Sequence, residues 1–249
     1  MQILEKANLE DIDNWYSSAI EEGGLALIDK PKTWTSFDVV NKLRRVARIR
    51  KTGHAGTLDP LATGLLILCF GKATKQSNDY QGLNKTYWTE IKIGAKTKSF
   101  DAETEEEDIC DFSHITTEQI EEAVRFYMGT FEQIPPIYSA KSVNGVRLYN
   151  HARNNREIVI APSLVTINSI GSIETDFPYV RFSVECSKGT YIRSLASDIG
   201  NKIGVGAYLS NLRRTAIENF SVDRALTIDE FVNAIQIMHN SASLIQENN

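Results

Sequence analysis

The chain has 249 residues, 42% of them hydrophobic, which is enough to bury a core in one large domain or in one domain plus a small appendage. It contains no apolar run near the ~20 residues of a membrane span and no secretory-type N-terminus, so we expect a cytoplasmic protein. An odd number of widely spaced cysteines (Cys69, Cys110 and Cys186) favours reduced thiols over a zinc knuckle or a redox pair. The net charge of −5 does not by itself suggest a nucleic-acid partner.

The N-terminal segment, residues 1–23, predicts a loosely packed helix from Leu9 to Glu21, to which we assign no chemistry. After Gly23-Gly24 we expect a short buried strand over residues 25–29, ended by Lys30-Pro31. Lys30 either contacts phosphate or is an ordinary solvated turn lysine, and the sequence favours neither reading.

A capping box at Thr35-Ser36-Phe37-Asp38 predicts the start of an amphipathic helix. Eight Lys and Arg residues stand against one acid between Lys30 and His54, whereas residues 101–122 hold ten acids and no Lys or Arg. Such a polarised chain can carry a local positive surface that draws phosphates while remaining acidic overall. The alternative is a pair of solvated helix faces without function.

The chain is organised around the segment GHAGTLDPLATG, residues 53–64, which is followed by the apolar run of residues 65–70. Its glycines permit backbone conformations that other residues resist, and Pro60 stiffens the turn that presents Asp59. A carboxylate on a stiff turn beside a buried strand suits a nucleophile or a general acid or base. An Asp-Pro pair alone is more often an ordinary turn.

This whole segment resembles the motif around the catalytic aspartate of TruB-type tRNA pseudouridine synthases, which convert a uridine in the T-arm loop of tRNA to pseudouridine. Lys85-Thr86-Tyr87 is similar to a second family signature, whose tyrosine stacks on the target base. Tyr87 begins an alternating strand over residues 86–94 and could equally be a core aromatic. The polar residues 95–113 predict a surface loop that contains the familiar spacing Thr97-x-x-x-Asp101.

A capped helix is expected after Thr116, followed by a stiff excursion that contains Pro135-Pro136 and the hairpin signal Asn144-Gly145. The resemblance implies a thumb-like insertion here, about residues 130–160, that grips RNA. A helix with outward-facing Arg153 and Arg156 is expected within it.

An alternating strand over residues 180–186 precedes a helix whose first turn contains Arg193. Since a cation in a first turn opposes the helix dipole, Arg193 should have a specific anionic partner. The segment KGTYIRSLASDIG resembles the family motif whose arginine pairs with the catalytic aspartate. A third resemblance, residues 209–215, implies that Leu212 lines the uracil pocket and that arginines such as Arg214 meet RNA.

Strands and helices alternate irregularly, with hairpin signals, so we expect an α+β fold with a mixed, largely antiparallel sheet flanked by helices, which agrees with the architecture that the resemblance implies. We expect an N-terminal extension (1–23), a catalytic domain (24–222), and a C-terminal helix with a frayed tail (223–249) but without a full PUA-type domain. The expected site combines catalytic residues with substrate contacts: Asp59, Arg193, Tyr87, Tyr191, Leu212, His54, Lys30 and Arg214. His54 would fill the gap left by the extruded base, or simply cap a turn.

The expected partner is a tRNA T-arm stem-loop, and the chain is expected to act as a monomer. The sequence contains no metal-ligand cluster, dinucleotide fingerprint or P-loop, so no cofactor is expected. It does not decide whether the carboxylate attacks the base or first helps to remove a ribose proton. The alternatives are an RNA-folding chaperone, a hydrolytic nucleosidase and a guide-RNA-dependent synthase.

Overall fold

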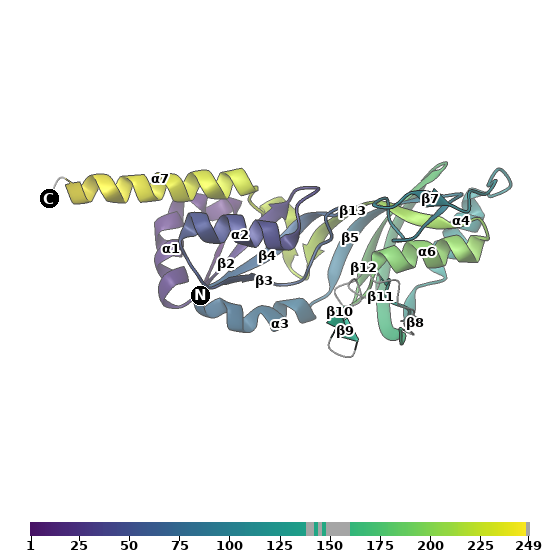
Figure 1. Cartoon of the computed structure of the whole chain (residues 1–249), viewed down its shortest axis with the longest axis horizontal. Coiled ribbons are helices and arrows are strands. Elements are labelled where there is room, and N and C mark those ends of the chain that lie inside the picture. Colours follow the sequence, from purple (N-terminus) through teal and green to yellow (C-terminus); the bar gives the residue numbers. More distant parts are fainter. Residues whose placement is uncertain (138–141, 144–145, 148–159, 248–249) are drawn as a thin grey trace. The chain divides into compact units, whose positions relative to one another are not determined.

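The structure is a computed structural model that describes residues 1–137, 142–143, 146–147 and 160–247 (Figure 1). The chain divides into two compact units. Unit 1 comprises Met1–Lys85 and Arg213–Asn249, and unit 2 comprises Thr86–Leu212. No helix in the described part of the chain is both long and apolar enough to cross a membrane.

The strands of unit 1 follow the order β1-β2-β4-β13, with β3 also pairing to β4. Strand β2 runs antiparallel to β4 and parallel to β1, and the last part of β13 runs parallel to the start of β4. The short β14 pairs with β13. Their bounds are β1 Gln2–Leu4, β2 Gly24–Lys30, β3 Thr52–His54, β4 Thr63–Phe70, β13 Ala207–Ile217 and β14 Phe220–Ser221.

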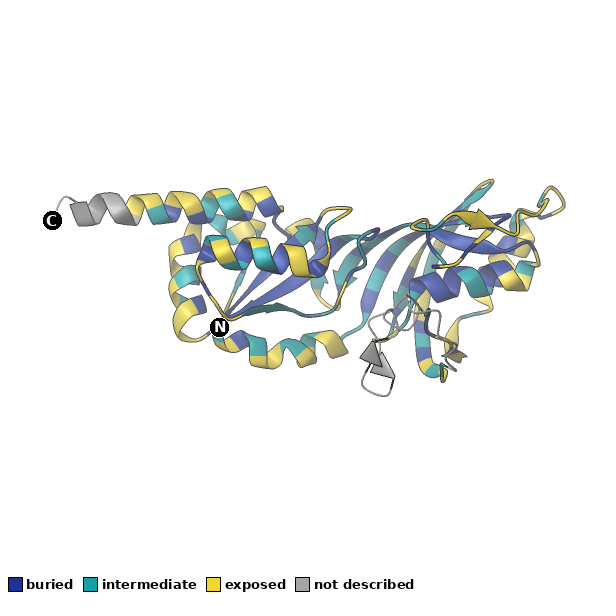
Figure 2. Ribbon diagram, in the orientation of Figure 1, coloured by how far each residue is buried: buried dark blue, intermediate teal, exposed yellow. Residues whose placement is uncertain are grey.

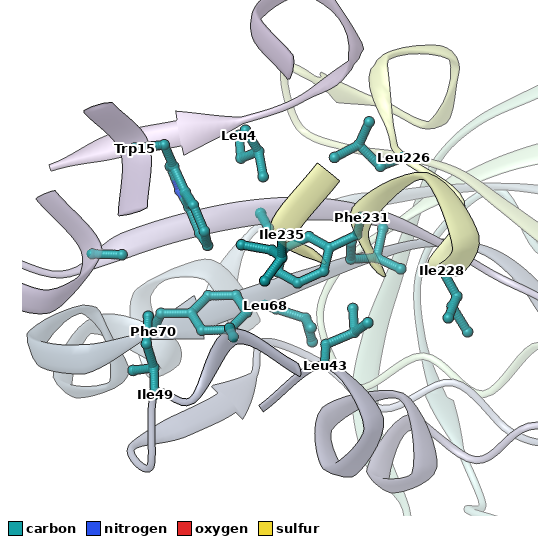
Figure 3. Packing of buried hydrophobic residues seen from close by; sticks show 14 of the residues in the cluster. Leu4, Trp15, Leu43, Ile49, Leu68, Phe70, Leu226, Ile228, Phe231 and Ile235 are labelled. Atoms are coloured by element: carbon teal, nitrogen blue, oxygen red, sulfur yellow. The ribbon is translucent and has the colours of Figure 1, made fainter. Parts of the chain in front are cut away.

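An aromatic cluster forms the centre of one core of unit 1 (Figure 3). The ring of Trp15 meets those of Phe70 and Phe231 edge-on, with centroids 5.3 and 5.8 Å apart. The Trp15 indole donates a 2.7 Å hydrogen bond to the Leu25 carbonyl, so its polar group is satisfied in the core. The expectation of a loosely packed N-terminal helix is therefore wrong, because this helix supplies a 1% exposed tryptophan to the core.

Helix α2 matches the local signals in the sequence, whereas α7 is longer than expected. Thr35 and Asp38 form the predicted capping box at the start of α2, and Arg48 ends that helix in the left-handed conformation with φ of 55°. Contrary to the frayed tail expected after Met238, α7 continues to Glu247. The helices are η1 Lys6–Asp11, α1 Ile12–Glu21, α2 Ser36–Ala47, η2 Gly71–Gln76, α3 Ser77–Gly82, η3 Val222–Arg224 and α7 Ile228–Glu247.

Unit 2 contains the strand order β13-β5-β12-β11-β8. Burial alternates along β5, as the sequence predicts, with Tyr87 and Ile91 on its buried face (Figure 2). The elements are β5 Lys85–Ile93, β6 Lys96–Thr97, β7 Glu106–Glu107, α4 Thr117–Arg125, β8 Gly129–Gln133, β11 Ser163–Asp176, β12 Tyr179–Cys186 and α6 Ile192–Ile203. Helices combined with a mixed, largely antiparallel sheet confirm the expected fold class.

The segment 95–113 is not simply a surface loop. Strands β6 and β7 pair antiparallel, and the side chains of Thr97, Ser99 and Asp101 are buried. These polar groups tolerate burial because they bond to one another: the hydroxyls of Thr97 and Ser99 both donate to Asp101.

Part of the expected thumb-like insertion is described. Strands β9 (Ser142–Val143) and β10 (Val146–Arg147) pair antiparallel on either side of Asn144-Gly145, as the hairpin signal predicts. The expected helix with Arg153 and Arg156 lies outside the described residues.

Candidate active site

Hydrogen bonds on both sides of Asp59 hold its loop, residues 55–62, against the segment that leads into α2. The Ser36 hydroxyl accepts from the Leu58 amide at 2.8 Å and donates to the Leu58 carbonyl at 3.1 Å. On the other side, the Thr33 amide donates to the Pro60 carbonyl at 2.8 Å. Asp59 itself is half-buried. Its carboxylate is therefore carried on backbone that is fixed at the preceding and the following residue.

Arg214 forms a second support for the Asp59 loop. Its Nε donates to the Leu65 carbonyl at 2.7 Å, and its two terminal nitrogens donate to the carbonyls of Gly56 at 3.1 Å and Thr57 at 3.5 Å. The side chain is only 1% exposed. The expectation that Arg214 contacts RNA is thus corrected, because its guanidinium is turned inward onto backbone carbonyls.

Close backbone packing accompanies this support. Gly64 lies beside Arg214 in the parallel pairing of β4 with β13 and has a φ of 102°. A Cβ at Gly64 would lie 2.3 Å from the Arg214 carbonyl oxygen, so only glycine fits there. Arg213 points to the other face of β13, where both its terminal nitrogens bind the Asp29 carboxylate, at 3.1 and 2.7 Å.

Two buried lysines also hold loop carbonyls. The Lys30 ammonium donates to the carbonyls of Pro31 at 2.9 Å and Trp34 at 2.6 Å, and the residue is 0% exposed. Both readings from the sequence, a phosphate contact and a solvated turn lysine, are therefore corrected. Lys85 similarly donates to the carbonyls of Gln81 and Leu83 and is 6% exposed.

His54 ends β3, immediately before the Asp59 loop. Burial and the positive charge of Arg214 hold the pKa of the His54 imidazole below its usual value. The ring is therefore neutral at physiological pH. Its Nδ1 is buried and has no hydrogen-bond partner among the described residues.

In unit 2, Arg193 has the anionic partner that its place in a first helical turn requires. Its Nη1 lies 3.4 Å from a carboxylate oxygen of Asp101 and donates to the Ser99 carbonyl at 3.3 Å. Both members of the ion pair are buried, at 6% and 0% side-chain exposure. The sequence does not identify Asp101 as the partner of Arg193, although the spacing Thr97-x-x-x-Asp101 is visible in it.

The other predicted residues of unit 2 are buried or half-buried. Tyr191 precedes α6, and the side-chain amide of Gln133 holds it by accepting from the Tyr191 amide at 2.8 Å and donating to the Tyr191 carbonyl at 3.1 Å. Tyr87 on β5 and Leu212 on β13 are 9% and 7% exposed. Gln133 follows no motif in the sequence, and only the fold brings it to Tyr191.

Unit 1 therefore carries Asp59 and His54 together with the supporting cations Lys30 and Arg214. Unit 2 carries the remaining predicted residues, which are Tyr87, Tyr191, Arg193 and Leu212. The pairing of Arg193 with Asp59 that the resemblance implies stays a prediction. No group of three or more His, Cys, Asp or Glu residues suited to a metal ion occurs in the described ranges.

Family models match this chain over most of its length. Residues 44–192 match the model of the TruB family pseudouridylate synthase (N terminal domain), and residues 193–247 match the tRNA pseudouridylate synthase B C-terminal domain. The chain belongs to the TruB family of pseudouridine synthases. It is accordingly an isomerase that forms pseudouridine from uridine.

Curated relatives agree with this assignment. The tRNA pseudouridine synthase B of Chloroherpeton thalassium is 46% identical over 219 residues, covering 86% of this chain and 91% of the relative. The protein of the same name from Flavobacterium johnsoniae is 45% identical over 222 residues, covering 86% and 97%. A solved chain from a Cbf5-Nop10-Gar1 complex has a TM-score of 0.68 and 26% identity, and the match covers 88% of this TruB-family chain and 56% of that chain.

Proposed function

We propose that this enzyme isomerises a uridine in the T-arm loop of tRNA and that Asp59 is its nucleophile. The observation that carries the proposal is the fixation of the Asp59 loop by Ser36, Thr33 and Arg214 in a chain of the TruB family. A carboxylate that must attack one atom of a bound base benefits from backbone that does not move, since small misplacements cost large factors in rate. The relatives named tRNA pseudouridine synthase B support tRNA as the substrate.

The target base must leave the RNA stack before the carboxylate can reach it, which costs a few kcal/mol. Stacking of the extruded base on Tyr87 is worth roughly 1–3 kcal/mol, so it offsets much of that cost. A neutral His54 suits the vacated position, since an uncharged ring needs no counter-ion among the bases. In this proposal the side chains of Tyr191 and Leu212 also pack against the extruded uracil.

Arg193 keeps the nucleophile charged once RNA covers the site. Desolvation can raise the pKa of a carboxyl by up to 3–5 units, whereas a nearby cation lowers it by about 1–3. Asp101 and the Ser99 carbonyl hold the Arg193 guanidinium, so its orientation is set before RNA binds. Asp101 is in this scheme a positioning residue, because it acts through Arg193.

The reaction needs no oxidant or cofactor. The bond from uracil N1 to the ribose breaks, the base turns, and its C5 bonds to the same ribose carbon. The C5 proton then leaves to solvent while N1 gains a proton, so that atoms and charge balance. The bond that a carboxylate oxygen of Asp59 forms to the bound base breaks again after C5 has bonded to the ribose, so the carboxylate is regenerated.

The test is to incubate T-arm RNA with wild type and with Asp59→Asn and to determine base identity at each uridine. We expect pseudouridine with the wild type, none with Asp59→Asn, and RNA binding with both. Asp79→Asn, an exposed aspartate of α3, is the matched control and should retain full activity. Isomerisation by Asp59→Asn would remove Asp59 from the mechanism, and release of free uracil would favour a hydrolytic nucleosidase.

A further inference from the structure

A pocket of about 540 Å³ opens on unit 1 at the start of α2. The proposed chemistry uses none of the side chains that line it, which are Thr33, Trp34, Asp38, Asn41, Lys42 and Arg45. Ligand pockets in proteins measure roughly 300–1,000 Å³, so this one is large enough for a nucleotide. Buried positions recur along α2 at helical spacing between exposed and half-buried ones (Figure 2), so the helix buries one side and presents the other to solvent.

The lining combines the groups that a single-stranded nucleotide needs. Trp34 is half-buried, which fixes an aromatic ring at the pocket wall, and its carbonyl is held by the buried Lys30 ammonium. Lys42 and Arg45 are exposed and lie three residues apart on one helix, so their cations reach the same region. Neither forms an ion pair within the described ranges, which leaves both charges available for phosphate.

Asp38 is the single acid in the lining, and its place explains how a phosphate would be oriented. Its carboxylate accepts from the Thr35 amide and hydroxyl, which holds the Asp38 pKa below its usual value and keeps the group anionic. A phosphate is repelled from that end and attracted to Lys42 and Arg45, one and two turns further along the helix. Asn41 lies between the two ends and offers both a donor and an acceptor.

The pocket is tied directly to the Asp59 loop. Thr33, which lines the pocket, donates its amide to the Pro60 carbonyl, and Ser36 binds both backbone groups of Leu58. An RNA nucleotide held in this pocket therefore sits on backbone that is bonded to the residues before and after Asp59. This position suits a neighbour of the target uridine rather than a distant part of the RNA.

We propose that this pocket binds a single-stranded nucleotide flanking the target uridine, with its base on Trp34 and its phosphate between Lys42 and Arg45. The inference rests on the proposed function for the identity of the RNA. The ligand is RNA rather than an arbitrary anion, because the lining combines an aromatic stacking surface with two cations. Proteins bind single-stranded nucleic acid through this combination.

The first test compares Trp34→Leu with Trp34→Phe in binding a T-arm stem-loop RNA. Leucine retains apolar packing but has no aromatic face, whereas phenylalanine retains the face. We expect Trp34→Leu to bind roughly 5- to 100-fold more weakly, the range for loss of one stacked base, and Trp34→Phe to stay within about threefold of wild type. Tryptophan fluorescence of the wild type should be quenched by the stem-loop, and Trp34→Leu should lose that quenching.

The second test neutralises the cations. Lys42→Gln with Arg45→Gln should weaken binding and reduce the slope of log affinity against log salt by about 1–1.5, because two phosphate contacts are removed at about 0.7 each. Lys72→Gln with Lys75→Gln removes the same charge from exposed positions of η2 and should leave affinity and slope nearly unchanged. A T-stem duplex without the loop should not quench Trp34.

The outcomes distinguish a failure of the pocket proposal from a failure of the proposed function. The pocket proposal is overturned if Trp34→Leu binds like wild type, or if the loop-free duplex quenches Trp34 as strongly as the stem-loop. It is also overturned if both double variants lose affinity equally. If the wild type isomerises no uridine while Trp34→Leu still loses affinity and quenching, the proposed function fails and the pocket stands. Thermal unfolding of each variant identifies any that does not fold, in which case the charge variants decide.

Discussion

Replacing Arg214 with methionine tests whether a buried arginine that supports the Asp59 loop controls catalysis. Methionine has a similar length and fills the space but donates no hydrogen bond. The change removes the donors to the carbonyls of Gly56, Thr57 and Leu65, two of which lie at 3.1 and 2.7 Å from the guanidinium. The 3.5 Å contact to the Thr57 carbonyl is too weak to count in the stability calculation.

The expected destabilisation follows from these two bonds. A hydrogen bond to a charged group contributes about 1.5–3 kcal/mol, so two of them give roughly 3–6 kcal/mol. At about 2–4 °C per kcal/mol for a chain of this size, that loss lowers the unfolding temperature by roughly 6–24 °C. Arg224, which pairs with Glu5 and is 46% exposed, is the matched control, and Arg224→Met should cost about 1 kcal/mol or less.

The catalytic effect should exceed the effect on RNA binding. Freeing the Asp59 loop should lower the single-turnover rate of pseudouridine formation by about 100-fold or more, since a 1 Å misplacement can cost that much. Affinity for T-arm RNA should change by less than about threefold, because Arg214 is not exposed to RNA. Arg214→Lys keeps the charge but not the fork of donors, so it should recover little of the rate.

The pKa of His54 provides a measurement that would not change if Arg214 had only a structural role. Burial and, after it, the charge of Arg214 hold the pKa of His54 down, so Arg214→Met should raise the His54 pKa part of the way towards its ordinary value in an NMR titration, and Arg214→Lys should not. An unchanged rate and unfolding temperature in Arg214→Met would refute the reasoning. Equal losses of rate and affinity would instead make Arg214 an RNA contact.

Two further changes test other buried groups. Arg193→Lys should reduce turnover far more than RNA affinity, because one ammonium cannot hold both Asp101 and the Ser99 carbonyl in the same geometry; equal losses would make Arg193 a mere phosphate contact. Burial raises the pKa of Asp198 from 3.8 to about 6. Between these two pH values the folded state binds more protons than the unfolded state, so the stability of the fold falls as the pH rises through this range. Asp198→Asn should therefore stabilise the protein at pH 8 by on the order of 2–3 kcal/mol and give no such gain at pH 4, as measured by denaturant unfolding, and an equal gain at both would contradict the ionisation argument.

Several elements could be predicted because their signals are local. The capping box of Thr35 and Asp38 starts α2, and alternating burial along β5 follows its alternating residue types. The aspartate loop was recognisable from one continuous segment, because turn-forming glycines, a proline and a buried strand succeed one another in the chain.

The roles of several charged residues could not be predicted from the sequence alone. Lys30 and Arg214 look like surface cations in the sequence, and the fold turns them onto loop carbonyls. A usable signal exists for Arg214, since it shares a face of β13 with the buried Leu212 while Arg213 lies on the other face. That signal depends on recognising β13 as a strand, which its polar composition obscures.

The sequence by itself determined the family and the fold class and singled out Asp59 as the candidate nucleophile, because each of these inferences depends on residues that are contiguous or regularly spaced. Only the tertiary structure decided which groups hold the Asp59 loop and which groups hold Arg193. Arg214 contacts Gly56, which lies 158 positions away in the chain, and Arg193 contacts Ser99, which lies 94 positions away. No regular spacing in the sequence links the residues of either pair. A buried cation can satisfy its donors on any nearby carbonyl, so its partner is fixed by the packing of the fold and not by the residue type.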